Sequence, residues 1–394
     1  MQKIKSLEGL RGIAALIVFF GHLKYTCFLV EYESITSCVH NLPMFYFLKV
    51  MLTNILAIFF DVELAIWVFW FLSSYVISIL FFKANNDYDK ILIAYFSKRY
   101  FRLVFPVLAS VAFAYILLKM GLIYNHQLAY LQGTQYVNGW LNSFYNFEPD
   151  LIIAIQSAVF DTFFNYQGLS TYNASLWTIQ SEYLGSLFTF SLFGIVKHNS
   201  QRVLIYTLIL IVLLKLQLFW LCAFLIGHAL CDYDYSGSNH TIIVRMRDIE
   251  QRLNRFKLPV FIGSLLFIIL GRNILTFIKV PPELHSLLLS IFVVYMCLRS
   301  EYLKNIFSTR IPLWLGKNSF SMYLIHLPLI CSLTCFLILT NDSLFGKVSA
   351  CFITLIVLLI ISYFFTRYID KNSIALANRI GDYLKKKSEK LSSI

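Results

Sequence analysis

The segment KSLEGLRGIAALIVFFGHLKYTCF, from Lys5 to Phe28, is apolar enough to enter a membrane but carries Arg11 and His22. These two residues are eleven positions apart, so an α-helix places them on one face, separated by about 16 Å along its axis. Arg11 would lie near one membrane surface and His22 near the middle of the bilayer. Because ionisable side chains inside a membrane are costly and usually functional, this segment predicts both a membrane fold and a site.

The composition of the chain agrees with a membrane protein. Hydrophobic residues make up 58% of the sequence and charged residues only 14%, whereas soluble proteins have about 25% charged residues. The apolar runs are long and lack alternation with period two, which favours helices over the strands of a membrane barrel. The first run has no small-residue cleavage site, so we expect no cleaved signal peptide.

The pattern of positive charge predicts the topology. No Lys or Arg occurs between residues 120 and 196. Because loops rich in Lys and Arg stay in the cytoplasm, we expect both termini there and two larger loops outside, 31–54 and 123–174. The result is an all-α polytopic fold with about ten transmembrane helices, of which the fifth and sixth are short enough to form a tight hairpin. The expected spans are 10–30, 55–82, 103–122, 175–196, 203–216, 218–231, 258–277, 283–299, 313–338 and 347–367.

The remaining stretches fit one membrane domain, residues 1–370, and a basic cytoplasmic tail, residues 371–394. The lysines of the tail would hold it on anionic membrane lipid, and 233–257 is expected to be a basic cytoplasmic loop. These loops account for the net charge of +12, so no nucleic-acid partner is predicted. The stretch 150–166 would either lie on the outer surface or dip into the membrane. The eight cysteines show neither metal-type pairing nor a disulfide framework.

Five stretches, in the same order along the chain, resemble motifs of the integral-membrane acyltransferase-3 family. Gly9-Leu10-Arg11-Gly12 with His22 is similar to the family's opening Gly-Leu-Arg-Gly run and its later His. The other four resemble a Phe-Phe-x-Leu-Ser-Gly-Phe segment, a basic loop ending in Arg-Leu-x-x-Pro, a Leu-Trp-x-Leu-x-x-Glu motif and a Tyr-Leu-x-His-x-Pro motif. They are Phe69–Val76 (FWFLSSYV), Ser97–Pro106 (SKRYFRLVFP), Ser175–Tyr183 (SLWTIQSEY) and Leu315–Leu329 (LGKNSFSMYLIHLPL).

The resemblance implies a membrane O-acyltransferase that moves an acetyl group from cytoplasmic acetyl-CoA to a hydroxyl. The acceptor would be a cell-surface glycan, such as O-antigen or exopolysaccharide, or a lipid-linked sugar. A bacterial inner membrane is the implied location, and the chain resembles members without an appended hydrolase-like domain. No metal is expected, and the sequence predicts neither the acceptor sugar nor the oligomeric state.

Two positions depart from the family pattern. Ser73-Ser74 stands where the family usually has Ser-Gly, and a side chain in place of glycine predicts different packing there. Asp370-Lys371 stands where the family usually has Glu-Pro, so no role is predicted for a carboxylate at that position.

Four cationic residues are candidates for binding the CoA phosphates. Arg11 is either a topological anchor at the cytoplasmic end of the first span or a bidentate phosphate contact. Lys98, Arg99 and Arg102 are either positive-inside charges or phosphate ligands. The second interpretation is supported by the spacing of Arg99 and Arg102, one turn apart on a helix that enters the membrane.

His22 and Glu182 are the predicted catalytic residues. Burial favours a neutral imidazole at His22, which can take a proton from the acceptor hydroxyl. Two alternatives remain for His22, a covalent acyl-enzyme and a structural hydrogen-bonded histidine. Glu182, near the outer end of the fourth span, would orient His22 or bind the sugar, because a carboxylate at membrane depth needs a partner; interfacial capping is the alternative.

Five further residues are candidates for binding the acceptor. Trp177 is either an interfacial anchor or a platform on which a sugar ring stacks, and Ser181 lies beside it. His326 has either a packing role or a direct one, in a span that Pro328 is predicted to kink. The candidates are Trp177, Ser181, Ser73, Tyr323 and His326.

A transporter or flippase of a lipid-linked glycan is the alternative function, since the same Arg, His and Glu residues would suit a substrate or proton path. The set of motifs argues against it, as does the lack of paired spans broken by Gly or Pro. A non-catalytic scaffold would leave Arg11 and His22 on one face unexplained.

Overall fold

The structure of this chain is a computed structural model that describes residues 4–41, 45–83, 88–133, 139–168, 171–197, 199–235, 245, 248–250 and 256–391. Within these ranges the regular secondary structure is helical and no strand occurs, so the all-α prediction is confirmed. Most of the predicted basic loop 233–257 lies outside the described residues.

Seven helices in the described part of the chain are long and apolar enough to cross a membrane. They correspond to seven of the predicted spans and confirm a multi-pass membrane protein. The first, α1 (Lys5–Cys27), carries both Arg11 and His22, as predicted. The other six lie in α4 (Val62–Lys83), α5 (Tyr88–Lys119), α14 (Lys257–Phe277), α15 (His285–Arg299), α17 (Arg310–Leu329) with α18 (Cys335–Thr340), and α19 (Leu344–Phe365) with α20 (Lys371–Leu391).

The other three predicted spans form α10 (Trp177–Val196), α11 (Arg202–Lys215) and α12 (Phe219–Tyr235). Helix α11 has 14 residues and is therefore about 21 Å long, less than the roughly 30 Å of a bilayer core. Gln217, between α11 and α12, has a φ of 56°, and the two helices pack together. The predicted tight hairpin is confirmed, whereas the count of ten spans and the cytoplasmic termini stay predictions.

The chain divides into two compact units. Helices α1, α5, α10 and α17 contribute residues to both. Unit 1 comprises Met1–Ala14, Met44–Phe96 and Leu184–Trp314, and unit 2 comprises Ala15–Pro43, Ser97–Tyr183 and Leu315–Ile394.

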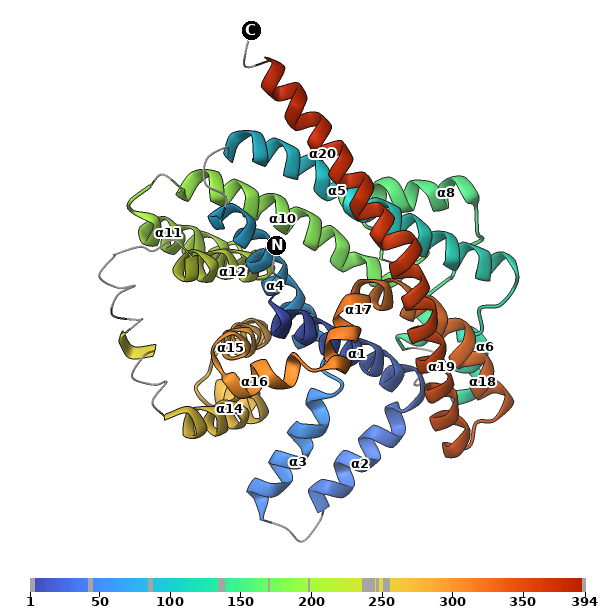
Figure 1. The fold of residues 1–394 in the computed structure, drawn as a ribbon. Helices are drawn as coiled ribbons and strands as arrows, with labels where there is room; N and C mark the ends of the chain where they lie inside the picture. The colour runs from blue at the N-terminus through green and yellow to red at the C-terminus, as the bar shows by residue number, and fades with distance from the viewer. Residues whose placement is uncertain are drawn as a thin grey trace. The chain divides into compact units, whose positions relative to one another are not determined.

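The core of unit 1 is α4, which packs against α12 and α15 (Figure 1). A Cβ atom at Gly227 of α12 would lie 2.7 Å from the Phe71 carbonyl oxygen, so only glycine allows this close approach. Ser74 Oγ donates to the Phe224 carbonyl at 2.5 Å. Ser74, at the position where the resembling motif has glycine, is thus accommodated by a hydrogen bond. Unit 1 also contains α3 (Tyr46–Ile58), η5 (Pro282–Leu284) and α16 (Glu301–Phe307).

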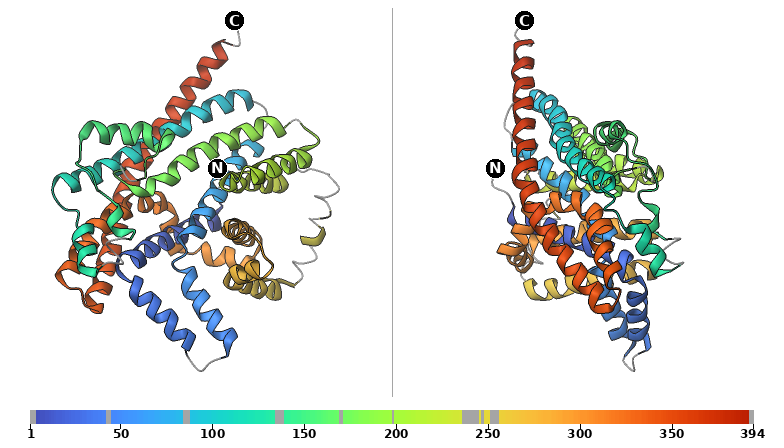
Figure 2. Two further views of the ribbon diagram at one scale, coloured as in Figure 1. Left: turned by 180° about the vertical axis from the view of Figure 1, so that it is seen from behind. Right: turned by 90° about the vertical axis from the view of Figure 1, so that its right-hand side faces the viewer.

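Unit 2 holds the C-terminal helices and the segments that follow α5. Helices α19 and α20 are joined by the π-helical turn η7 (Thr366–Asp370) and form one continuous helical run that bends between them (Figure 2). The predicted tail is therefore helical from Lys371 to Leu391. The other elements are α2 (Leu29–Asn41), α6 (Asn125–Gln132), η1 (Leu141–Ser143), α8 (Leu151–Gln156), η2 (Ser157–Asp161), α9 (Thr162–Phe164), η3 (Ala174–Leu176) and η6 (Ile330–Thr334).

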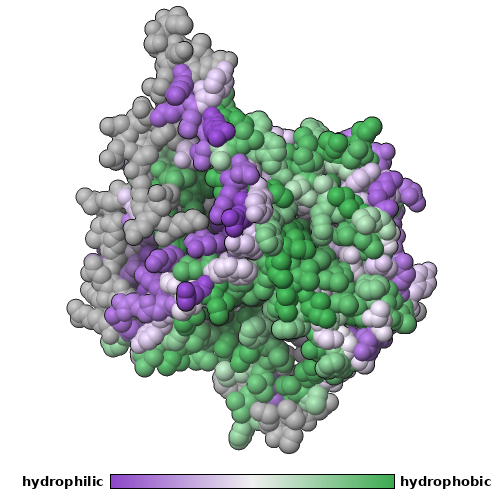
Figure 3. Space-filling view, turned by 45° about the vertical axis from the view of Figure 1, so that its right-hand side comes forward, coloured by the Kyte–Doolittle hydropathy of each residue, from purple (hydrophilic) through white to green (hydrophobic). Residues whose placement is uncertain are grey.

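Hydrophobic side chains cover broad areas of the surface in Figure 3. Helix α19 shows why: residues four positions apart share a helix face. One face exposes Phe352, Ile356, Ile360 and Phe364, whereas Ala350, Thr354, Leu358 and Ser362 are buried. An apolar face of this kind suits contact with lipid.

The stretch 150–166 forms α8, η2 and α9, and it begins at Asp150, whose side chain accepts from the N–H groups of Ile152 and Ile153. The Tyr100 hydroxyl donates to the Val159 carbonyl at 2.8 Å. This contact joins the stretch to α5, and both alternatives, on the outer surface or in the membrane, stay predictions.

Candidate active site

Two histidines from distant parts of the chain meet in unit 2. His22 of α1 and His326 of α17 are 304 positions apart, and the His22 Nδ1 and His326 Nε2 atoms are 2.8 Å apart. Their rings are nearly parallel, with an interplanar angle of 1°. His326 is 1% exposed, and its Nδ1 lies 2.6 Å from the Tyr323 carbonyl oxygen.

These contacts assign the proton on each ring. A carbonyl oxygen only accepts, so the proton of His326 is on Nδ1. Burial favours the neutral imidazole, which carries one proton, so His326 Nε2 must accept and His22 Nδ1 must donate. His22 is thereby held with a lone pair on Nε2. An imidazole in this tautomer can act as a general base.

Trp140 stacks on the ring of His22, and it was not among the site residues predicted from the sequence. The two ring centroids are 5.0 Å apart and the interplanar angle is 18°. Trp140 lies in the predicted outer loop, just before η1. The only hint of a site role in the sequence was that Trp140 is aromatic. Trp is also common at membrane interfaces, so this hint was not specific.

Pro328 leaves one backbone carbonyl of α17 without its helical hydrogen bond, and two buried side chains donate to that carbonyl. Because proline has no backbone N–H, the carbonyl four residues earlier, that of Leu324, loses its helical partner. Ser110 Oγ and Asn173 Nδ2 each donate to this carbonyl at 2.7 Å. Both side chains are fully buried. They hold the turn of α17 that carries His326.

The same arrangement occurs in α5. Pro106 frees the carbonyl of Arg102, and Ser373 Oγ of α20 donates to that oxygen at 2.9 Å. The Arg102 guanidinium pairs with Asp370 of η7 at 2.5 Å and lies 5.2 Å from the Phe320 ring centre. Asp370, to which the sequence assigned no role, thus fixes a predicted phosphate ligand.

Glu182 contacts Arg99, with the Arg99 Nη2 and Glu182 Oε1 atoms 2.6 Å apart. The sequence placed Arg99 on the cytoplasmic side and Glu182 on the outer side, and this separation is wrong. The charge rule assigns loops to a side but does not give the depth that long side chains reach. Lys98 is half-buried beside Arg99 and has Asp382 of α20 as an acidic neighbour.

Tyr323 connects α17 to the start of α10. Its hydroxyl donates to the Ser175 carbonyl at 2.9 Å and accepts from Thr178 Oγ1 at 2.7 Å. Trp177 is 42% exposed and Ser181 is half-buried. These bonds give Tyr323 a structural role; the predicted contact of Tyr323, Trp177 and Ser181 with an acceptor stays a prediction.

Arg11 and Ser73 belong to unit 1. Gly9, the first glycine of the Gly-Leu-Arg-Gly run, faces α16 and its C-terminal turn. A Cβ atom there would lie 1.9 Å from the Phe307 carbonyl oxygen, so the glycine has a packing reason. The predicted roles of Arg11 and Ser73 stay predictions.

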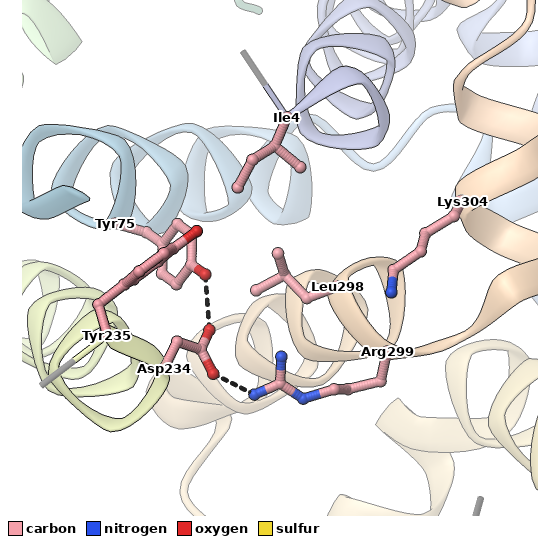
Figure 4. A pocket seen from close by; sticks show the side chains of 7 residues that line it. All are labelled: Ile4, Tyr75, Asp234, Tyr235, Leu298, Arg299 and Lys304. Carbon is pink, nitrogen blue, oxygen red and sulfur yellow. Dashed lines mark hydrogen bonds and ion pairs between the residues drawn. The ribbon is translucent and has the colours of Figure 1, made fainter. Parts of the chain in front are cut away.

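Unit 1 has an open pocket of about 340 Å³ (Figure 4). Asp234 accepts from the Tyr75 hydroxyl at 2.6 Å and pairs with Arg299, which also contacts Glu250. The ion pair between Asp234 of α12 and Arg299 of α15 links these two helices. The lining residues are Ile4, Tyr75, Asp234, Tyr235, Leu298, Arg299 and Lys304.

Comparison with known proteins gives one family match. The acyltransferase domain model of the acyltransferase-3 family matches residues 4–367, nearly the whole chain. No curated protein and no solved structure matches the chain. The chain therefore belongs to the acyltransferase-3 family and is a multi-pass membrane acyltransferase.

Proposed function

We propose that this enzyme transfers an acetyl group from cytoplasmic acetyl-CoA to a hydroxyl of a cell-surface glycan or lipid-linked sugar, in a bacterial inner membrane. The observation that carries the proposal is the bond between His22 and His326, which leaves the Nε2 lone pair of His22 available. A fixed neutral imidazole suits proton removal from a hydroxyl.

In the proposed reaction, His22 Nε2 takes the hydroxyl proton while the acceptor oxygen attacks the thioester carbonyl carbon. The new C–O bond forms as the C–S bond breaks. His22 then gives the proton to the departing CoA thiolate, and the enzyme returns to its starting state. General base catalysis of this kind contributes about 10²–10⁴-fold. We favour direct transfer over an acyl-enzyme; detection of an acyl-enzyme with labelled donor by rapid mixing, lost in His22→Ala, would overturn this preference.

Lys98, Arg99 and Arg102 are proposed to bind the phosphates of CoA, and Arg11 of unit 1 is proposed separately as a phosphate contact. Pairing with Glu182 and Asp370 supports this, because it holds each guanidinium in place, and a planar guanidinium suits bidentate contact with phosphate. In this arrangement Glu182 positions Arg99, in addition to its proposed contact with the sugar.

The acceptor would approach Trp177 and Ser181 near the start of α10, with Tyr323 as a further proposed contact. Ser73 of unit 1 is proposed separately as an acceptor contact. The exposed indole of Trp177 supports stacking on a sugar ring. Mass spectrometry of surface glycan from cells with and without this chain would identify the sugar and the position of the acetyl group.

The test uses the purified full-length protein with labelled acetyl-CoA and surface glycan. His22→Ala should slow transfer about 10²–10⁴-fold while the protein still inserts and still binds CoA. His285→Ala, the same substitution in α15, is the matched control and should keep its activity. Normal glycan acetylation by His22→Ala would overturn the assignment, and failure of the unaltered protein to bind CoA would favour the transporter.

A further inference from the structure

We propose that Trp140 is a positioning residue that stabilises the protonated form of His22 during transfer. The inference rests on the proposed function, in which His22 becomes a cation when it takes the hydroxyl proton. The Trp140 and His22 rings are stacked with centroids 5.0 Å apart. That distance is within the roughly 6 Å over which a cation interacts with an aromatic face.

The loop around Trp140 is built to hold the indole in place. The Trp140 carbonyl accepts from the backbone N–H and the Oγ of Ser143, at 3.2 and 2.6 Å. Asn125, fully buried on α6, donates from Nδ2 to the carbonyls of Leu141 and Phe144 at 2.9 and 3.1 Å. The Phe144 ring packs edge-on against the indole, with centroids 4.7 Å apart. The backbone is therefore fixed on the C-terminal side of Trp140.

The charge environment of His22 makes an aromatic face useful. His326 is the titratable group that faces it from α17, and it supplies a neutral lone pair in place of a carboxylate. Lys24 and Tyr25 follow His22 on its own helix, and the stretch from 139 to 144 carries no titratable side chain. The negative face of an indole attracts a cation that is removed from water. Trp140 thus offers the imidazolium a second stabilising contact.

The test compares unaltered enzyme, Trp140→Leu and Trp140→Phe over a range of pH. Loss of the indole should lower the plateau of kcat/KM by about 2- to 30-fold. It should also move the midpoint of the acidic limb to lower pH by about 0.4–1.5 units, because the cation is less stable and His22 stays neutral further into acid. Phenylalanine, a weaker partner for a cation than tryptophan, should give an intermediate position.

Tyr25→Leu is the matched control. Tyr25 contacts the indole, with ring centroids 6.1 Å apart, and its replacement should leave the acidic limb of the pH profile in place. A lower plateau with an unmoved limb in both Trp140 variants would overturn the inference and leave a packing role. A readout independent of transfer is the pH dependence of His22 carbethoxylation by diethyl pyrocarbonate, followed by mass spectrometry. It must show the same displacement. If His22→Ala kept full transfer activity, the proposed function itself would fail, which is a different result.

Discussion

Replacing His326 with alanine should slow transfer without changing CoA binding. The substitution removes the acceptor that holds the proton on His22 Nδ1, at 2.8 Å in the structure. His22 is then free to rotate or to move its proton to Nε2, and the lone pair required of the base is lost. His326→Gln should recover part of the rate, because an amide oxygen can accept a hydrogen bond at a similar reach.

The size of the effect follows from burial. His326 is 1% exposed and its bond with His22 is part-buried, so water replaces the lost acceptor only in part. A buried donor without a partner costs about 1–3 kcal/mol. Since about 1.4 kcal/mol corresponds to a tenfold change in rate, kcat should fall about 5- to 150-fold. This is less than the expected effect of removing the base itself, about 10²–10⁴-fold.

The assay is a double-mutant cycle of His22→Ala and His326→Ala, read by single-turnover transfer from labelled acetyl-CoA. If His326 acts through His22, the double variant should be as slow as His22→Ala alone. Equal factors from His326→Ala in both backgrounds would refute the reasoning and assign His326 to folding or to another contact. Calorimetric titration of CoA checks that binding is unchanged.

Gly227→Ala should destabilise the protein by about 1–3 kcal/mol, because the added Cβ atom meets the backbone of α4 and an overpacked site relaxes only in part. Thermal size-exclusion chromatography measures the loss of stability. Asn173→Ala loses four hydrogen bonds, each worth about 0.5–1.5 kcal/mol. Its cost should be smaller in a Pro328→Ala background, where a restored N–H satisfies the freed carbonyl. Arg99→Ala should weaken CoA binding more than acceptor binding in calorimetric titrations, and Glu182→Gln should have the same effect to a lesser degree.

Each of these predictions has a control or an opposing result. Gly263 has open space where a Cβ atom would lie, so Gly263→Ala should not lower stability. Equal costs of Asn173→Ala with and without Pro328 would show that the proline carbonyl is not the reason for the asparagine. Equal losses of CoA and acceptor affinity in Arg99→Ala would count against a phosphate contact.

Long apolar segments determined the part of the fold that sequence could predict. A backbone in lipid must satisfy its own hydrogen bonds, so an apolar run such as the one around His22 is expected to form a helix. Helix α1 with Arg11 and His22 followed from this rule. The rule does not say which helices pack together, and the contact of His22 with His326 depends on packing between residues 304 positions apart.

The pairings of charged and polar side chains were the least predictable part of the site. The proline at 328 implied a carbonyl in need of a donor, but no local rule points to Ser110 and Asn173 as the donors. The charge rule placed Arg99 and Glu182 on opposite sides, and the structure pairs them. Ion pairs at membrane depth form wherever two long side chains reach each other, which depends on helix tilt and packing.

The helical run from Leu344 through η7 to Leu391 is about 70 Å long at 1.5 Å per residue, more than twice the roughly 30 Å of a bilayer core. This length lets the run cross the core and continue beyond it, so the tail is an ordered helix rather than a loose one. The run is joined to α5 where Asp370 pairs with Arg102 and where Ser373 donates to the carbonyl freed by Pro106. The predicted lipid contact of the lysines would thus be made by a helix whose start is fixed beside the cations of α5.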